Sequence, residues 1–229
     1  MNLRLNTLAQ MVDQDARVAD IGTDHAYLPI ALVQSGKIDY AIASDIAQGP
    51  LANAQEDITQ AGLEQQIEVR LGAGLETITH EDRIDTVVIA GMGGKLMTEI
   101  LNSAWQNGFQ FPTLVLEPNV GEPGVRKWLV DHSYQIEAED LIAEAGHTYE
   151  LIKAVRVPAP VKLNDAEIFF GPLILKAKNP VFYQKWRGQL AYHQKLLVNL
   201  NKAKNKDTEH IEQIEHEITM IKEELDDQG

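Results

Sequence analysis

The sequence predicts an α/β protein in which a doubly wound sheet of parallel strands is followed by a hairpin of two long helices. Three observations support this prediction. Short apolar segments alternate with segments of helical periodicity from residue 3 to residue 130, as expected for parallel strands joined by crossover helices. Glycine or acidic residues follow or end five of these apolar segments. After residue 160, apolar residues recur every three or four positions over two long stretches, which is typical of paired helices.

Apolar spacing, helix stops and turn residues place each element. Gly36 and Gly62 each end a segment of helical spacing, and Pro50 suits the first turn of the helix that ends at Gly62. The strand expected over 85–90 contains a continuous apolar run, Val87-Val-Ile-Ala90, which predicts a central strand buried on both faces. The expected helices cover 3–12, 27–34, 51–61, 95–101 and 125–130. The expected strands cover 18–21, 40–44, 67–71, 85–90 and 113–117, with later, partly antiparallel strands over 134–142, 148–156 and 168–173.

The proline-rich segment Val157-Pro-Ala-Pro160 is the predicted boundary between a domain of residues 1–158 and a second domain of residues 159–229. In the second domain, two stretches of helical spacing flank a lysine-rich turn over 202–207, which predicts an antiparallel hairpin of helices. Apolar residues from Ile211 to Leu225 recur in the 3-4-3-4 pattern of a coiled-coil seam. The seam can close within one chain or between two, so we expect a monomer or a weak homodimer.

Composition excludes several classes of function. The chain has 229 residues, enough for one or two domains with a sizeable core. It contains no cysteine, which excludes disulfides, thiolate metal sites and a cysteine nucleophile. Its first residues lack a signal-peptide pattern, and no apolar run approaches the roughly 20 residues of a membrane span. We therefore expect a cytoplasmic protein with neither a membrane nor a metal as partner.

Charge is distributed unevenly along the chain. The net charge of −14 argues against nucleic-acid binding driven by bulk charge. However, nine cations lie between Lys162 and Lys206 beside only two acids, so this segment is basic and the remainder strongly acidic. A basic segment on an acidic protein can bind a polyanion, or it can be a solvated face that balances an acidic partner helix. The sequence leaves both interpretations open.

Polar and glycine-rich turns follow the predicted parallel strands. The segment Val18–Pro29 joins a buried strand end to a helix through Gly22, where a tight turn suits glycine. Ligands of such sheets bind at the edge where the strands' carboxyl ends lie, so these turns predict a single ligand site. The turns are Gly22–His25, Asp45, Gly72–Gly74, Gly91–Gly94 and Glu117–Asn119.

Carboxylates near the first turn indicate the type of ligand. Asp45 ends the second strand about 20–25 residues further on, where nucleotide-binding folds place a carboxylate for ribose hydroxyls. Asp20 and Asp24 add negative charge, which repels a pyrophosphate and suits a cationic or ribose-bearing cofactor. S-adenosylmethionine, with its sulfonium and amino groups, therefore fits better than NAD.

These motifs together resemble one family, the TrmK-like bacterial tRNA methyltransferases that act on N1 of adenine 22. Ala19-Asp-Ile-Gly-Thr-Asp-His-Ala-Tyr-Leu-Pro29 is similar to the family's cofactor motif, and the resemblance covers nearly the whole chain. It implies a Rossmann-like class I methyltransferase domain over 1–158 that uses S-adenosylmethionine. It also implies a C-terminal coiled-coil domain over 159–229 that contacts tRNA. Further matching segments are Gly49-Pro50, Val69–Leu75, Ile89–Gly94, Glu117–Asn119, Arg126–Leu129 and Tyr149-Glu150.

Two positions depart from the family pattern. Ala73 stands where the family often has Asp or Asn, which leaves contact with the cofactor's adenine to the backbone. Glu117 stands where the family often has Gln, and it adds a charge near the expected target base.

The resemblance also implies roles for individual residues. Adenine N1 has a free lone pair, so no base is needed before attack, but the methylated ring is initially cationic. The target must also be unpaired or flipped out of its helix. Asp24 is therefore expected to stabilise charge and Asn119 to read the base edge, as the catalytic pair. The expected cofactor-binding residues are Asp20, Gly22, Asp24, His25, Asp45, Ile46, Gly72, Ala73, Gly74, Gly91 and Met92. The expected substrate-binding residues are Arg4, Tyr27, Arg70, Gly93, Gly94, Glu117, Pro118 and Arg126.

Other interpretations stay open for several of these residues. Tyr27 could stack on the target base or could be a core residue, and Arg4, Arg70 and Arg126 could hold phosphates or form salt bridges. For the whole chain, one alternative is a methyltransferase that acts on another substrate. The other is a non-catalytic scaffold that dimerises through its coiled coil.

Overall fold

The computed structural model describes residues 2–202 and 206–226. The chain divides into two compact units between Leu173 and Ile174. Part of the predicted lysine-rich turn, residues 203–205, lies outside the described residues. In the described part of the chain, no helix combines the length and the apolar character needed to span a membrane.

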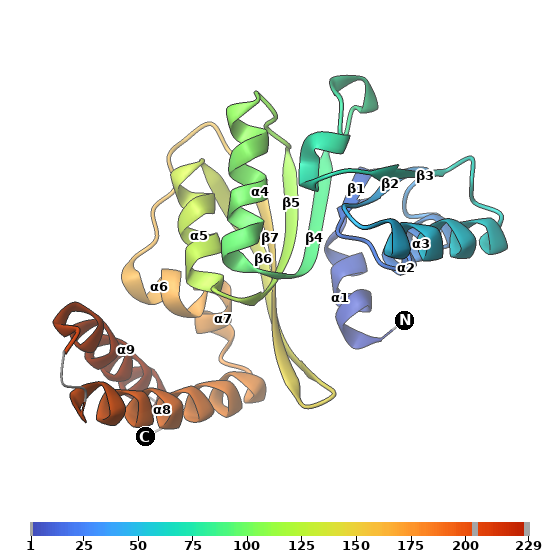
Figure 1. The fold of residues 1–229 in the computed structure, drawn as a ribbon. Coiled ribbons are helices and arrows are strands. Elements are labelled where there is room, and N and C mark those ends of the chain that lie inside the picture. The colour runs from blue at the N-terminus through green and yellow to red at the C-terminus, as the bar shows by residue number, and fades with distance from the viewer. Residues whose placement is uncertain (1, 203–205, 227–229) are drawn as a thin grey trace. The chain divides into compact units, whose positions relative to one another are not determined.

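The first unit is built on one mixed sheet of seven strands (Figure 1). These strands are β1 (Arg17–Ile21), β2 (Tyr40–Asp45), β3 (Ile67–Leu71), β4 (Thr86–Gly93), β5 (Thr113–Val120), β6 (Tyr134–Glu144) and β7 (His147–Arg156). Their order in the sheet is β3-β2-β1-β4-β5-β7-β6. The first five are parallel, and β7 runs antiparallel to both of its neighbours. The prediction of five parallel strands followed by antiparallel ones is confirmed.

Helices cover both faces of this sheet (Figure 1). On one face lie α1 (Leu3–Met11), α2 (Tyr27–Gln34) and α3 (Gln48–Ala61), and on the other lie α4 (Gly94–Gln106) and α5 (Glu122–Asp131). Alternation along β1 decides which side chain enters which layer. Val18 packs with the first group of helices, whereas Ala19 and Ile21 pack with the second. Burial on both faces explains why the parallel strands read as continuous apolar runs.

The prediction of a strand over residues 168–173 is wrong. Residues 168–170 end the short helix α6 (Asp165–Phe170), and after Gly171 residues 172 and 173 begin the short helix α7 (Pro172–Ala177). The Asn164 side chain accepts the Glu167 N–H, and the Glu167 carboxylate accepts the Asn164 N–H, at 2.9 Å each. The run Ile-Phe-Phe has the composition of a strand, but this reciprocal cap begins a helix just before it.

A buried ion cluster ties residues 165–173 to the first unit, so the division of the chain falls after the predicted boundary at residue 158. The Arg126 side chain on α5 is fully buried between the carboxylates of Glu139 and Glu150. Its Nη1 also donates to the carbonyl oxygens of Ile168 and Phe169, at 3.3 and 3.4 Å. Because this guanidinium is enclosed and paired, it does not provide the phosphate contact expected of Arg126.

Gly171 packs directly against this cluster, so we expect Gly171→Ala to be strongly destabilising. A Cβ there would lie 2.6 Å from Arg126 Nη2 and 2.7 Å from Glu139 Oε1. We expect a loss of about 3 kcal/mol in the free energy of unfolding, from overlap and from the left-handed backbone at φ +91°. Gly108→Ala is the matched control, since its φ is +87° but nothing lies within 4 Å of its Cβ. Denaturant unfolding of both variants measures the difference, and equal losses would show that overlap at Gly171 contributes nothing.

The second unit consists chiefly of two long helices, α8 (Pro180–Lys202) and α9 (Thr208–Asp226). Lys178, just before α8, pairs with Glu224 near the end of α9, at 2.8 Å. His193 Nε2 lies 3.0 Å from Glu217 Oε2, so the pairing runs antiparallel. The buried side chains of α9 are those of the predicted seam, namely Ile211, Ile214, Ile218 and Ile221.

Candidate functional site

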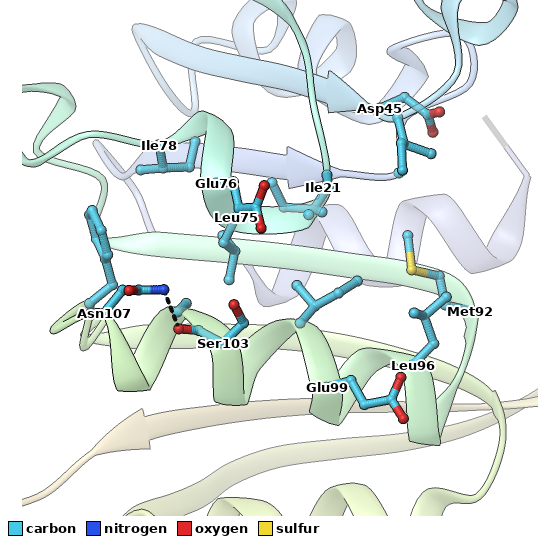
Figure 2. A pocket seen from close by; sticks show the side chains of 17 residues that line it. Ile21, Asp45, Leu75, Glu76, Ile78, Met92, Leu96, Glu99, Ser103 and Asn107 are labelled. Carbon is cyan, nitrogen blue, oxygen red and sulfur yellow. Dashed lines mark hydrogen bonds between the residues drawn. The ribbon is translucent and has the colours of Figure 1, made fainter.

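A cavity of about 570 Å³ opens where the carboxyl ends of β1, β2 and β4 meet the turn after β3 (Figure 2). It extends along α4 from Met92 and Leu96 at one end to Asn107 at the other. Six of the predicted cofactor-binding residues line it, namely Gly22, Asp45, Ile46, Ala73, Gly74 and Met92. The other five, Asp20, Asp24, His25, Gly72 and Gly91, lie beside these residues in the chain.

Backbone hydrogen bonds hold the first three turns together. The N–H groups of Gly22 and Thr23 donate to the Ser44 carbonyl oxygen on β2, at 2.8 and 3.0 Å. The Gly72 N–H donates to the Asp45 carbonyl oxygen at 3.0 Å, which joins the turn after β3 to the end of β2. These contacts fix the three turns relative to one another at a single rim, as the sequence predicted for ligand binding.

A side chain at Gly22 would have to displace the end of the Met92 side chain. Gly22 has a φ of +82°, and a Cβ there would lie 2.2 Å from Met92 Cε. Met92, from the end of β4, therefore packs directly on the Gly22 backbone and forms one end of the cavity. The left-handed backbone at Gly22 explains the glycine in the first turn.

Two carboxylates of different character lie near the rim. Asp20 is buried, and burial raises its pKa to about 6, an effect that a hydrogen bond from Thr23 opposes and the charge of Asp45 reinforces. Asp45 is partly exposed and accepts the Ala47 N–H at 2.7 Å. Asp45 lines the cavity at the end where Met92 lies (Figure 2). The rim therefore presents negative charge to a ligand.

The first turn also leads into a stacked aromatic pair, in which His25 is half-buried and Tyr27 is exposed. The rings of His25 and Tyr27 stack with centroids 4.9 Å apart and an interplanar angle of 5°. His25 Nδ1 lies 2.8 Å from Asp57 Oδ2, and its Nε2 lies 3.9 Å from Asp24 Oδ2. Tyr27 is 53% exposed, so it is not a core residue, and the Asp24 side chain is 72% exposed.

The far side of the rim is formed by the ends of β4 and β5. Glu117 is fully buried, and its Oε2 accepts hydrogen bonds from Arg4 Nη1 at 2.7 Å and from the Gly91 N–H at 3.1 Å. Burial raises the pKa of Glu117, although Arg4 and the Gly91 N–H act in the opposite direction. Asn119 is exposed and donates to the Gly91 carbonyl oxygen at 2.7 Å. Arg4 also lies over the Tyr149 ring, 5.4 Å from its centroid.

Comparison with known proteins places this site in a family. The family model for TrmK, tRNA (adenine(22)-N(1))-methyltransferase, matches residues 18–223. The chain belongs to the TrmK family. A curated TrmK relative, the tRNA (adenine(22)-N(1))-methyltransferase of Bacillus subtilis, is 32% identical over 99% of this chain and 97% of its own length.

Two solved structures related to the TrmK family contain the cofactor or its product. A Streptococcus pneumoniae protein crystallised with S-adenosyl-L-methionine is 36% identical, with a TM-score of 0.88 over 98% of this chain and 99% of its own. TrmK of M. capricolum, solved with S-adenosyl-homocysteine, is 33% identical, with a TM-score of 0.86 over 99% and 98% of the two chains. The seven-stranded sheet and its helices are therefore the Rossmann-like methyltransferase fold.

The Arg70 side chain is bound by neighbouring carboxylates, although its place in the TrmK motif suggested a contact with substrate. It makes two 2.6 Å hydrogen bonds to the Asp82 carboxylate and two, of 2.8 and 2.9 Å, to the Glu68 carboxylate. Its Nη1 also donates to the Thr77 carbonyl oxygen at 2.8 Å, in the 3-10 turn η1 (Gly74–Thr77). Of the two interpretations left open, the structure supports a salt bridge for Arg70 and for Arg4. Arg70 thus braces the turn that lines one wall of the cavity.

Sequence reasoning about the TrmK motifs missed the wall that α4 contributes. Leu96, Ile100, Ser103 and Asn107 line the cavity from successive turns of this helix (Figure 2). Their spacing of three to four residues was the available signal, but it equally describes a helix face packed in a core. Among the described residues, no group of three or more His, Asp or Glu side chains is arranged to hold a metal ion.

Proposed function

We propose that the protein transfers a methyl group from S-adenosylmethionine to N1 of adenine 22 in bacterial tRNA. The observation that carries the proposal is that the turns after β1, β2, β3 and β4 meet over one cavity in a chain of the TrmK family. Because tRNA is the proposed substrate, we expect the protein to act in the cytoplasm.

The cavity suits this cofactor in size, shape and charge. Its volume of about 570 Å³ lies within the range of small-molecule sites. We assign Asp45 to the ribose hydroxyls, Ile46 and Gly72–Gly74 to the adenine, and Asp20 to the cationic methionine end, with Gly22, Gly91 and Met92 as the close-fitting floor. When bound, S-adenosylmethionine supplies an electrophilic methyl group on its sulfonium.

The exposed side chains of the first turn and of β5 would receive the target adenine. Asp24 would stabilise the positive charge that develops on the ring as N1 is methylated. Asn119 would accept a hydrogen bond from the adenine amino group through its side-chain oxygen, because its side-chain nitrogen already donates to the Gly91 carbonyl oxygen. The stacked pair His25 and Tyr27 offers a ring face for the base. The backbone of Gly93, Gly94 and Pro118 would complete this side of the site.

The buried position of Glu117 changes its expected role. Its side chain is enclosed, with one oxygen bound to Arg4 and Gly91, so we do not assign it a direct contact with the base. Arg4 is paired with Glu117, but about a quarter of its side chain stays accessible, so we propose that it also meets a phosphate at this rim.

The second unit would provide the main contact with tRNA. On α8, Arg187, Lys195 and Lys202 are exposed, and among the described residues none has a carboxylate within salt-bridge distance. Their spacing of eight and seven residues places them on one side of the helix. We infer that α8 and α9 form a coiled-coil hairpin that closes within one chain and presents this basic face to the tRNA backbone.

A transfer assay tests the proposed function. The protein should incorporate label from methyl-labelled S-adenosylmethionine into an unmodified tRNA transcript with adenine at position 22, and nucleotide mapping should locate 1-methyladenine there. A transcript with guanine 22 should accept no label. Incorporation at another nucleotide would reassign the substrate, and no incorporation into any tRNA would favour a non-catalytic scaffold.

The raised pKa of Asp20 predicts how cofactor binding depends on pH. Its pKa of about 6 lies above the usual 3.8, so folding is favoured by the protonated form and the free energy of unfolding falls as pH rises from about 4 to 6. Binding of a cation instead favours the ionised form of Asp20, because the negative carboxylate attracts it. We therefore expect affinity for S-adenosylmethionine to fall by up to about tenfold per pH unit below pH 6.

Calorimetric titrations between pH 5 and 8 measure this dependence. The Asp20→Asn variant should bind more weakly at pH 8 and should show little change in affinity down to pH 5. A wild-type affinity that stays constant across pH 6, or an Asp20→Asn variant that keeps the full dependence, would remove Asp20 from the cofactor site.

A further inference from the structure

A bulge interrupts the pairing of β4 with β5 beside the cavity. Ala90 pairs with Glu117, and the next pairing along is Met92 with Pro118, so the register shifts at Gly91. Gly91 has a left-handed φ of +77°. An extra residue of this kind redirects the residues that follow it.

Side chains of β5 replace the backbone partners that the bulge removes. Glu117 Oε2 accepts the Gly91 N–H at 3.1 Å, and Asn119 Nδ2 donates to the Gly91 carbonyl oxygen at 2.7 Å. The pairing also shifts on β5, because Met92 pairs with Pro118 and Gly93 with Val120, so the ladder skips Asn119 and its side chain bonds to Gly91 instead. Both backbone polar groups of Gly91 are therefore held from one strand, which fixes the direction in which the chain leaves the bulge.

The residue that leaves the bulge is Met92. Its side chain lines the cavity near Leu96, at the end where Asp45 also lies (Figure 2). Its methyl group packs on Gly22, where an added Cβ would be only 2.2 Å away. A small rotation of the peptide at Gly91 would move Met92 off Gly22 and change the shape of this end of the cavity.

We propose that Glu117 and Asn119 are positioning residues for the cofactor site, acting through the Gly91 bulge to set Met92 against Gly22. The proposal rests on the proposed use of this cavity by S-adenosylmethionine. It gives the buried Glu117 a role that needs no contact with substrate, and it gives Asn119 a role that exists before tRNA binds.

The affinity of the full chain for S-adenosyl-homocysteine in the absence of tRNA tests this proposal. We expect Asn119→Ala to weaken binding about fivefold, the effect of losing one hydrogen bond, although a base-reading side chain would leave this affinity unchanged. Asn119 is exposed, so its loss should not prevent folding. Asn53→Ala, which removes an exposed asparagine of α3, is the matched control and should bind as the wild type does.

A double-mutant cycle shows whether the effect passes through Met92. If it does, Asn119→Ala should cost less than about twofold when introduced into the Met92→Ala variant. Glu117→Gln should keep affinity within about twofold, because the amide oxygen can still accept the Gly91 N–H. The proposal is overturned if Asn119→Ala binds as the wild type does, or if its effect is undiminished without Met92. It is also overturned if Glu117→Gln weakens binding by as much as Asn119→Ala. Failure of the wild-type chain to bind the compound at all would instead contradict the proposed function.

Discussion

Replacing Asp24 with asparagine is expected to lower kcat for methyl transfer at least about 100-fold, the size of effect seen when a group that stabilises developing charge is removed. The Asp24 side chain is 72% exposed and stands at the rim of the site, beside His25. It would face a ring that becomes cationic during the reaction, so its charge acts on the transition state more than on the bound cofactor. Affinity for S-adenosylmethionine should therefore change by less than about threefold.

The substitution tests the charge alone, because asparagine preserves the shape of the side chain. Since the position is exposed, the change should have little effect on the stability of the fold. Single-turnover rates with saturating tRNA, together with cofactor titrations, separate the two effects. Asp39→Asn, at an exposed position just before β2, is the control and should leave both values unchanged. A fully active Asp24→Asn variant would exclude Asp24 from the chemistry, and a parallel loss of cofactor affinity would make it a binding residue instead.

The parallel part of the fold could be predicted because burial on both faces leaves a clear mark on sequence. Residues 87–90 of β4 show this, since they are apolar without alternation and lie between two helical layers. The segment 168–173 shows the limit, because an apolar run of three residues fits either a strand or a helix. Its cap at Asn164 and its anchor on Arg126 decide for helix, and the anchor depends on contacts with residues some 40 positions away.

The site was predictable where the backbone itself forms it. Glycine and acidic residues at strand ends predict turns such as Gly22–His25, and in the structure these turns meet at one rim. The arginines were not predictable, because a sequence does not show which carboxylate will reach them. Arg70 meets Asp82 from beyond the next turn, and Arg126 meets Glu139 and Glu150 on other elements. The sequence therefore does not distinguish an arginine that can bind a ligand from one that is paired with a carboxylate in the fold.

The triple variant Arg187→Ala, Lys195→Ala, Lys202→Ala is expected to raise KM for tRNA about 30-fold, taking about threefold for each exposed cation that meets a phosphate. The cations lie on one side of α8, so a single stretch of RNA backbone could meet all three. Removing them should also make the dependence of log affinity on log salt concentration shallower by about 2, because fewer counterions are released. Affinity for S-adenosylmethionine should stay within about twofold, since the cofactor residues lie in the first unit.

The control removes three exposed neutral side chains from the same helix, in Gln184→Ala, Gln194→Ala, Asn199→Ala. If the cations of α8 bind the tRNA backbone, the control should keep the wild-type KM and salt dependence. The triple cation variant should have a higher KM and a shallower salt dependence. If the segment is only a solvated face that balances an acidic partner helix, the cation variant should bind tRNA as well as the control does, and its cost should appear in the stability of the α8–α9 pair. The slope of log affinity against log salt concentration separates these cases. A variant that only destabilises the hairpin would bind more weakly but keep the wild-type slope, because the same number of counterions leaves the RNA.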